Sequence, residues 1–241
     1  MQDNLDVLAV VAHPDDAELT CGGTLIRMAD AGYRVGVLDL ADGSSGSRGN
    51  AAQRAAEAEA ASKVMGLAVR ENLGLPDAGL QDDPQSRLTL ARAIRRLGPK
   101  VLILPHWRSR HPDHEAAVRL GRAAAFLAGL KKIPGEGIPA RPEKILHALS
   151  FIEHGGKPTF VVDITGQFER KLEAVRCFTS QFGEDRLEAG ELFPNGQPLF
   201  DLLRTQALHY GSLIRALYGE PFLTRETVRV DDIVTMGVKS I

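Results

Sequence analysis

Short apolar runs alternate with segments of helical periodicity along the chain as far as Gly129. Four segments are apolar or extended and have the length of strands: Val7–Ala12, Arg34–Leu40, Asn72–Leu75 and Val101–Leu104. A helical segment follows each of them in turn: Gly23–Ala31, Ala51–Met65, Ser86–Leu97 and Asp113–Ala128. Because apolar strands separated by helices are covered on both faces, this pattern predicts a parallel sheet. The predicted fold class is α/β, a Rossmann-like three-layer sandwich with a mostly parallel sheet.

Longer loops begin after Gly129. The segment Lys131–Pro142 contains three prolines and two glycines and is predicted to be a surface loop. Beyond it we predict two extended segments, at Ile145–Ile152 and Phe160–Ile164, and a helix at Phe168–Phe178. A loop at Ser180–Pro198 then leads to a helix at Leu199–Leu217 and to a partly extended tail at Tyr218–Ile241. A length of 241 residues suits one hydrophobic core, so residues 1–241 are predicted to form a single domain.

Composition and charge argue against several classes of protein. Hydrophobic residues make up 44% and charged residues 25%, which is ordinary for a globular protein. The 29 Lys and Arg nearly balance 31 Asp and Glu, whereas nucleic-acid-binding proteins usually carry a strong basic excess. No apolar stretch approaches the roughly 20 residues that span a bilayer. The first apolar run lacks a basic leader, and two cysteines are too few for a disulfide framework. We expect a cytoplasmic protein that binds neither nucleic acid nor membranes.

Two polar tetrapeptides follow predicted strands. Val7–Ala12 runs into HPDD at 13–16, and Val101–Leu104 leads shortly to HPDH at 111–114. Open parallel α/β sheets bind ligands just beyond the carboxyl ends of their strands. Neither tetrapeptide suits a hydrophobic core, because each carries several ionisable side chains beside a proline. We therefore expect the two tetrapeptides to meet in one crevice.

Together the tetrapeptides offer imidazole and carboxylate ligands for a divalent metal. A catalytic zinc site typically has three protein ligands and keeps a fourth position for water. Two neutral histidines and one carboxylate leave a positive metal that lowers the pKa of that water toward neutrality. A neighbouring carboxylate can take the proton as the water attacks. HPDD supplies one aspartate for each task, and the two histidines of HPDH lie on one side of a helix that begins there.

A lone HPDD has a plainer interpretation, namely a turn in which an aspartate caps the following helix. A lone histidine at a strand end is also more often a satisfied polar residue than a metal ligand. Two His-Pro-Asp segments at two strand ends of one chain are much harder to explain in this way. The pair therefore favours a metal site.

Longer blocks of sequence surround the tetrapeptides: AHPDDAELTCGGTL (12–25), RGNAAQRAAEAEAA (48–61), PHWRSRHPDHEAA (105–117) and KLEAVRCFTSQF (171–182). These blocks resemble the PIG-L/LmbE-like zinc de-N-acetylases over nearly the whole chain. The C-terminal HYGSLIRALYGEPF (209–222) is similar to the branch that deacetylates N-acetylglucosaminyl-L-malate in bacillithiol biosynthesis. The resemblance implies hydrolytic de-N-acetylation of an N-acetylglucosamine glycoside, with that malate glycoside as the expected substrate. An inositol glycoside or a chitooligosaccharide is the alternative.

The resemblance also implies roles for individual residues. His13, Asp16 and His114 match the zinc ligands of the family, with one zinc per chain and another divalent metal as the alternative. Asp15 matches the general base. His111 matches the histidine that stabilises the tetrahedral intermediate or protonates the leaving amine. The family further implies a homo-oligomer, with a hexamer as the expected form.

Three residues are predicted to bind substrate. Arg54 matches a substrate-side arginine of the family, and Arg48 or Arg54 could bind a malate carboxylate bidentately. Tyr210 is the candidate for the tyrosine that some members use to bind the oxyanion, with a packing role as the alternative. Where the family often has Gly-Glu, this chain has Gly43-Ser44, so no acidic residue is available there.

Two other functions compete with the deacetylase. A Rossmann-like nucleotide-binding module would use the Gly-rich loop Gly43–Gly49, but it needs G-x-G-x-x-G directly after the first strand. HPDD occupies that place and presents carboxylates where a phosphate needs backbone amides. A phosphoesterase usually holds two metals about 4 Å apart and needs more ligands than the tetrapeptides supply.

Overall fold

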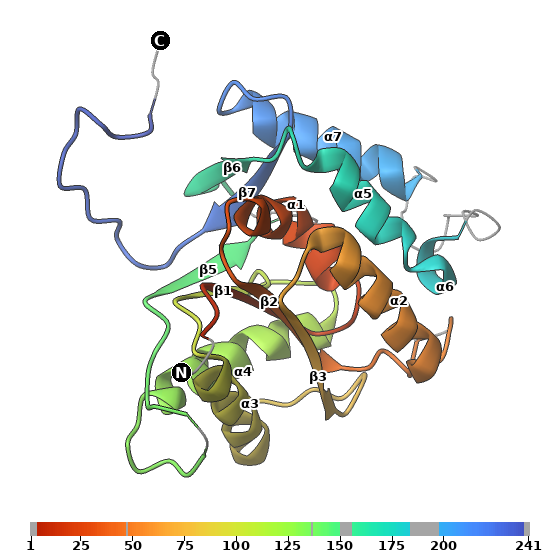
Figure 1. The fold of residues 1–241 in the computed structure, drawn as a ribbon, viewed down its shortest axis with the longest axis vertical. Coiled ribbons are helices and arrows are strands. Elements are labelled where there is room, and N and C mark those ends of the chain that lie inside the picture. The colour runs from red at the N-terminus through yellow and green to blue at the C-terminus, as the bar shows by residue number, and fades with distance from the viewer. Residues whose placement is uncertain (1–3, 47, 136, 150–155, 184–197, 239–241) are drawn as a thin grey trace.

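A central sheet with helices on both faces forms the body of the protein (Figure 1). The computed structural model describes residues 4–46, 48–135, 137–149, 156–183 and 198–238. Within these ranges the sheet has seven strands in the order β3-β2-β1-β4-β5-β7-β6. They are β1 Val7–Val11, β2 Val35–Ala41, β3 Val69–Leu75, β4 Val101–Leu104, β5 Lys144–Ala148, β6 Phe160–Asp163 and β7 Gly219–Leu223. The five strands from β3 to β5 are mutually parallel, and β7 runs antiparallel to both β5 and β6.

Helices cover both faces of this sheet. They are α1 Asp16–Asp30, α2 Ala51–Met65, α3 Pro84–Leu97, α4 Pro112–Ala128, α5 Phe168–Arg176, α6 Thr179–Phe182 and α7 Leu199–Ser212. Alternate residues of the strands point to opposite faces, so Leu8 and Val10 pack with α3 and α4, whereas Val7 and Ala9 pack with α1, α2 and α5. The predicted three-layer α/β sandwich with a mostly parallel sheet is confirmed.

The strand order brings the two tetrapeptides together. β1 is an interior strand from which the chain proceeds to β2 on one side and later returns to β4 on the other. The register pairs Val7 with Val101 and Ala9 with Ile103, so the carboxyl ends of β1 and β4 lie side by side. HPDD leads directly from β1 into α1, and HPDH forms the start of α4. A switch point of this kind is where open α/β sheets bind their ligands.

α1 begins seven residues earlier than predicted, at Asp16 instead of Gly23. The prediction was wrong because Gly22 and Gly23 have low helix propensity and looked like the start of the helix. Packing explains the glycine, since a Cβ at Gly23 would lie 2.7 Å from a side-chain carbon of Ile164. The early start puts HPDD at the amino end of the helix.

Other boundaries also differ from the prediction, and the helix α6 occupies the start of Ser180–Pro198, which was predicted to be a loop. β3 begins at Val69, three residues before the predicted start at Asn72. The added residues include two charged ones, which the apolar pattern did not mark as strand. Ion pairs accommodate them, since Arg70 pairs with Asp39 and Glu71 with Arg96. α7 ends at Ser212 instead of Leu217 because the chain turns back over the helix. The end of Ile145–Ile152, most of Ser180–Pro198 and the last residues of the tail lie outside the described residues.

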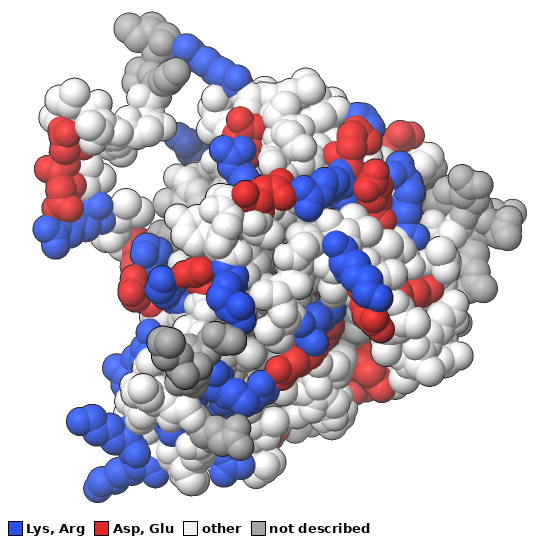
Figure 2. Space-filling view, viewed as in Figure 1, with Lys and Arg blue, Asp and Glu red and all other residues white. Residues whose placement is uncertain are grey.

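The surface mixes both signs of charge. Figure 2 shows basic and acidic side chains next to one another over much of the face that it displays. This arrangement agrees with a formal charge of -2. No helix in the described ranges is both long enough and apolar enough to cross a membrane.

His147 on β5 gives the fold a predictable response to acid. Its side chain is fully buried, and Nδ1 lies 2.9 Å from the carbonyl oxygen of Pro105, to which it donates. Burial lowers the pKa of His147 to about 4 from its usual value of 6.5. As the pH falls, the unfolded chain therefore binds a proton at His147 near pH 6.5, whereas the folded chain binds it only near pH 4. The free energy of unfolding should fall by about 3 kcal/mol over that window.

Chemical denaturation between pH 4 and 7 measures this effect. His147→Asn keeps a donor toward Pro105 but does not titrate, so its stability should depend less on pH than that of the wild type. His209→Asn removes an exposed histidine on α7 and is the control, which should keep the wild-type pH dependence. An unchanged slope in His147→Asn would assign the acid response to other groups.

Candidate functional site

The backbone turns sharply at Asp15, between β1 and α1. Its φ angle of 107° lies in the left-handed region that residues other than glycine rarely adopt. Asp15 occupies the N-cap position of α1, but its side chain makes no capping hydrogen bond, so the plain capping interpretation is wrong. Its Oδ2 instead accepts a hydrogen bond from Nη2 of Arg54 at 2.9 Å. The same Nη2 donates to the carbonyl of Pro14 at 2.5 Å. Backbone strain of this kind persists only where the surroundings hold it, and it is common at functional sites.

His13, Asp16 and His114 form a cluster where β1 and α4 meet. Asp16 Oδ1 lies 3.2 Å from His114 Nε2, and Asp16 Oδ2 lies 3.6 Å from His13 Nδ1. Asp16 Oδ2 also accepts the backbone N–H of His13 at 2.9 Å, which holds the carboxylate at the start of α1. The ligand atoms of the three side chains lie within 4.8 Å of one another. Two imidazoles and one carboxylate so arranged could hold a metal ion.

His111 stands beside this cluster as the N-cap residue of α4. Its Nδ1 accepts the backbone N–H of Asp113 at 3.2 Å, so the proton of the neutral ring is on Nε2. Burial, followed by the charges of His114 and His13, lowers the pKa of His111. The rings of His111 and His114 stack with centroids 4.9 Å apart, which confirms that both lie on one side of the helix start. Ser109 orients His114, since its Oγ lies 3.3 Å from Nδ1.

The electrostatics of the cluster favour a cation. Burial would lower the pKa of His13, but the surrounding carboxylates, Asp16 first, raise it to about 9. Burial would raise the pKa of Asp16, yet the charges of His114 and His13 hold it well below its usual value. Burial and then the charge of Asp16 raise the pKa of Asp15 to about 8, against the opposing charge of Arg54. The surroundings therefore stabilise positive charge strongly, which is what a divalent metal supplies, and the donor set fits such an ion.

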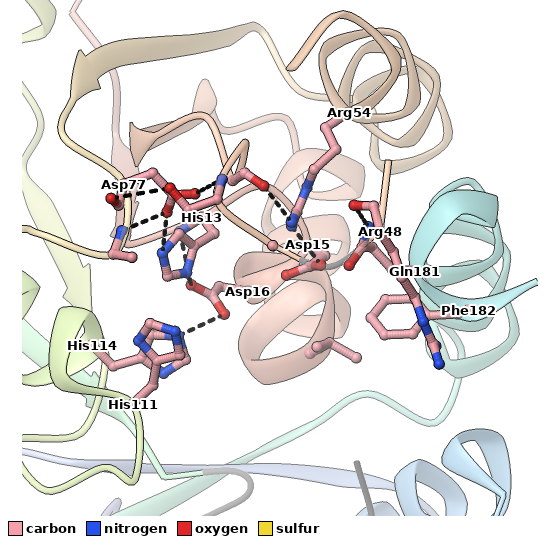
Figure 3. A pocket seen from close by; sticks show the side chains of 15 residues that line it. His13, Asp15, Asp16, Arg48, Arg54, Asp77, His111, His114, Gln181 and Phe182 are labelled. Carbon is pink, nitrogen blue, oxygen red and sulfur yellow. Dashed lines mark hydrogen bonds and ion pairs between the residues drawn. The ribbon is translucent and has the colours of Figure 1, made fainter. Parts of the chain in front are cut away.

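A pocket of about 500 Å³ opens over these residues (Figure 3). Seven of the eight predicted site residues line it, and they come from β1–α1, the Gly-rich loop, α2 and the start of α4. The exception is Tyr210 on α7, which is not among the described residues that line the pocket, and burial raises its pKa. The predicted role of Tyr210 stays a prediction without support from its position.

Arg48, Gln181 and Phe182 lie together on the side of the pocket away from His111 (Figure 3). Gln181 Nε2 donates to the backbone carbonyl of Arg48 at 2.9 Å, which ties the Gly-rich loop to α6. α6 is held in turn by the buried Glu57 of α2, whose carboxylate accepts the N–H and Oγ–H of Ser180, each at 2.7 Å. Residues 48–61 and 171–182, two of the sequence blocks that resemble the family, therefore build this side wall.

Arg54 has a different environment from Arg48. It is only 5% exposed, and besides Asp15 and Pro14 its Nη1 donates to the carbonyl of Gly43 at 3.3 Å. Gly43 has a φ of +72°, and a Cβ there would lie 2.5 Å from Cζ of Arg54. The guanidinium is therefore packed against the chain itself. Its contacts position Asp15, and because Arg54 also lines the pocket, its predicted contact with substrate stays a prediction.

Two aspartates of the site were missed from the sequence. Asp77 Oδ1 lies 3.0 Å from His13 Nε2, and Asp113 Oδ2 lies 3.2 Å from the same atom. Asp113 is the third residue of HPDH, where we assigned it no role. Asp77 follows β3, and a search for polar residues beyond every strand end, not only β1 and β4, would have found it.

Comparison with known proteins decides the family. The model of the family described as "PIG-L: GlcNAc-PI de-N-acetylase" matches residues 8–125. A diacetylchitobiose deacetylase of Thermococcus kodakarensis is 32% identical over 226 residues, which cover 89% of this chain and 80% of that protein. The chain belongs to the PIG-L family. The predicted family is thereby confirmed, and this PIG-L member is a hydrolytic enzyme of the deacetylase class.

Two further matches agree with the PIG-L assignment. The crystal structure of the conserved protein TT1542 of Thermus thermophilus is 40% identical, with a TM-score of 0.83, and the match covers 94% of this chain and 98% of that one. A probable N-acetyl-α-D-glucosaminyl L-malate deacetylase 2 of Bacillus anthracis is 25% identical over 214 residues, covering 81% of this chain and 90% of that protein. The relatives from Thermococcus kodakarensis and Bacillus anthracis thus carry the names of deacetylases for different N-acetylated sugars.

Proposed function

We propose that this PIG-L member hydrolyses the acetamide of an N-acetylglucosamine glycoside, using one zinc ion held by His13, Asp16 and His114. The observation that carries the proposal is the cluster of these three side chains beside a buried, strained Asp15 in one pocket. The reaction takes up one water and yields acetate and a free amine. Zinc in this set would act as a Lewis acid toward the acetamide carbonyl and would lower the pKa of water at its open position.

The residues around the metal set divide the proton transfers. Asp15 takes one proton from the attacking water and returns it to the amine nitrogen as the C–N bond breaks. His111 donates a hydrogen bond from Nε2 to the tetrahedral oxyanion, since its Nδ1 is occupied by the N–H of Asp113. That occupied Nδ1 disfavours a doubly protonated ring, so we assign oxyanion stabilisation to His111 and amine protonation to Asp15. Arg54 holds the Asp15 carboxylate in place.

The competing functions have less support. The turn after β1 presents the carboxylates of Asp15 and Asp16, whereas a nucleotide phosphate would need backbone amides there. The described residues offer two metal-binding sets, but both include His13. The two sets therefore cannot both be occupied as separate sites, and they offer one metal site instead of the two that a phosphoesterase uses.

For the substrate we propose N-acetylglucosaminyl-L-malate. Arg48 lines the pocket on the side away from His111 and His114, where the group attached to the sugar would lie. A guanidinium there can bind a malate carboxylate through two parallel hydrogen bonds. The resemblance of 209–222 to the bacillithiol branch supports the same choice. Diacetylchitobiose is the second candidate, favoured by the relative from Thermococcus kodakarensis.

Acetate release tests both levels of this proposal. The zinc-loaded enzyme is assayed with N-acetylglucosaminyl-malate, N-acetylglucosaminyl-inositol, N-acetylglucosamine and diacetylchitobiose. We expect the malate glycoside to give the highest kcat/KM. A higher value for diacetylchitobiose would overturn the malate assignment and keep the deacetylase, whereas no acetate from any of the four would overturn the deacetylase itself.

Arg48→Ala is expected to lower kcat/KM for the malate glycoside about tenfold, or about 1.4 kcal/mol, mainly through KM. The expected loss is modest because Arg48 is half-exposed and water screens its charge. The value for N-acetylglucosamine, which lacks the carboxylates, should stay within about twofold. Steady-state kinetics on both substrates measure the difference.

Arg108→Ala is the matched control, because Arg108 is exposed and is not among the described pocket-lining residues. This variant should keep the wild-type kcat/KM for both substrates. Equal losses on both substrates in Arg48→Ala would mean that Arg48 acts at the sugar or at the reaction centre.

A further inference from the structure

Carboxylates surround both ring nitrogens of His13. On one side Asp16 Oδ2 lies 3.6 Å from Nδ1. On the other side Nε2 lies 3.0 Å from Asp77 Oδ1 and 3.2 Å from Asp113 Oδ2. His13 could therefore join either of two metal-binding sets, one with Asp16 and His114 and one with His111 and Asp113. Which ring nitrogen of the neutral His13 carries the proton decides which of the two sets His13 can join.

Asp77 is itself held by hydrogen-bond donors only. Oδ2 accepts the backbone N–H of Ser45 at 2.6 Å, and Oδ1 accepts the backbone N–H of Ala78 at 3.0 Å. The Asp77 side chain is only 6% exposed. A carboxylate whose two oxygens already accept backbone N–H groups acts as an acceptor toward any further neighbour. Its contact with His13 therefore requires a proton on Nε2.

A proton on Nε2 has a direct consequence for the ligand set. It leaves the lone pair of the neutral ring on Nδ1, which faces Asp16. The set with His111 and Asp113 is then unavailable, because it lies on the protonated side of the ring. Carboxylates that accept the second N–H of a ligating histidine are known to orient the ring and to strengthen metal binding.

We propose that Asp77 is a positioning residue, which holds the Nε2–H of His13 so that Nδ1 faces the metal and which ties this ligand to the Ser45 turn. Ser45 belongs to the Gly-rich loop that also carries Arg48, so one carboxylate joins a metal ligand to the wall that we assign to the substrate. The inference rests on the proposed metal site of His13, Asp16 and His114.

Asp113 is the weaker of the two partners of Nε2. Its contact is longer, at 3.2 Å, and its other oxygen accepts the backbone N–H of Leu80 at 3.2 Å. It also belongs to the first turn of α4, whose position the fold determines independently. Removal of Asp77 should therefore not be fully compensated by Asp113.

Zinc affinity measured by competition with a chromogenic chelator tests the proposal. Asp77→Ala should raise the Kd for zinc about 10- to 100-fold, the usual cost of losing such a partner. Asp77→Asn should also weaken binding, because one amide oxygen cannot accept the three N–H groups that the carboxylate accepts. The matched control is Asp42→Ala, since Asp42 accepts the backbone N–H of Ser44 in the same loop and is not among the described carboxylates that contact His13. Its Kd should stay at the wild-type value.

The proton itself can be observed in the wild-type protein. In zinc-loaded protein with ¹⁵N-labelled histidine, long-range ¹H–¹⁵N spectra should show His13 with its proton on Nε2 and its metal on Nδ1. This measurement decides the question even where Asp77→Ala fails to fold, which circular dichroism would reveal. A proton on Nδ1, or an unchanged Kd in a folded Asp77→Ala, overturns the inference. Equal zinc affinity of the wild type and His13→Ala would instead overturn the metal site on which it rests.

Discussion

Asp15→Asn is expected to keep its zinc and to lose a factor of about 10²–10⁴ in kcat. The amide has nearly the shape of the carboxylate but cannot take a proton from water. Asp15 faces Arg54 and the pocket, whereas Asp16 makes the contacts with His13 and His114, so the metal set is preserved. KM should change little, because the contacts with the sugar are untouched.

Elemental analysis and steady-state kinetics on the same preparation measure this prediction. Asp16→Asn is the paired variant and should lose metal as well as activity. If Asp15→Asn proves metal-free while Asp16→Asn keeps its zinc and loses only rate, the two roles are reversed. Near-wild-type turnover by Asp15→Asn would remove the general base altogether.

His114→Ala and His13→Ala are expected to lose zinc and to reduce acetate release to background. Each removes one of three protein ligands, and the remaining histidine and carboxylate cannot complete the site. Chelation of the wild type should abolish turnover in the same way, and added zinc or another divalent ion should restore it. Metal content and activity measured in parallel give both results.

Two histidine variants calibrate these losses. His111→Ala should keep the metal and slow the reaction about 10²–10³-fold, because it removes an oxyanion donor only. His209→Ala, at an exposed position on α7, should leave both quantities unchanged. A full equivalent of zinc in both His13→Ala and His114→Ala would contradict the ligand assignment.

The sequence predicted the layers of the fold and the meeting of the two tetrapeptides. Apolar strands such as Val101–Leu104 are short, uniform and flanked by helices, so their pattern has one plausible solution. The rule that ligands bind beyond parallel strand ends then brought HPDD and HPDH into one pocket. Local signals were sufficient for these features.

Features that depend on tertiary contacts could not be predicted. Gly23 looked like a helix boundary until packing against Ile164 explained it. The contacts of Arg54 with Asp15 and Gly43 depend on how α2 meets the Gly-rich loop, which no local pattern indicates. Asp77 had no motif around it, and its contact with His13 joins segments that are 64 positions apart in the sequence. The predicted homo-oligomer, with a hexamer as the expected form, stays a prediction.

Zinc titration of acetate release tests the central claim most directly. Protein stripped of metal by a chelator is supplied with increasing zinc, and acetate and free amine are measured with an N-acetylglucosamine glycoside. Acetate release should rise in proportion to zinc, reach its maximum at one equivalent per chain and match the free amine mole for mole. Full activity in the metal-free protein, or no acetate at one equivalent of bound zinc, would contradict a deacetylase that works through His13, Asp16 and His114.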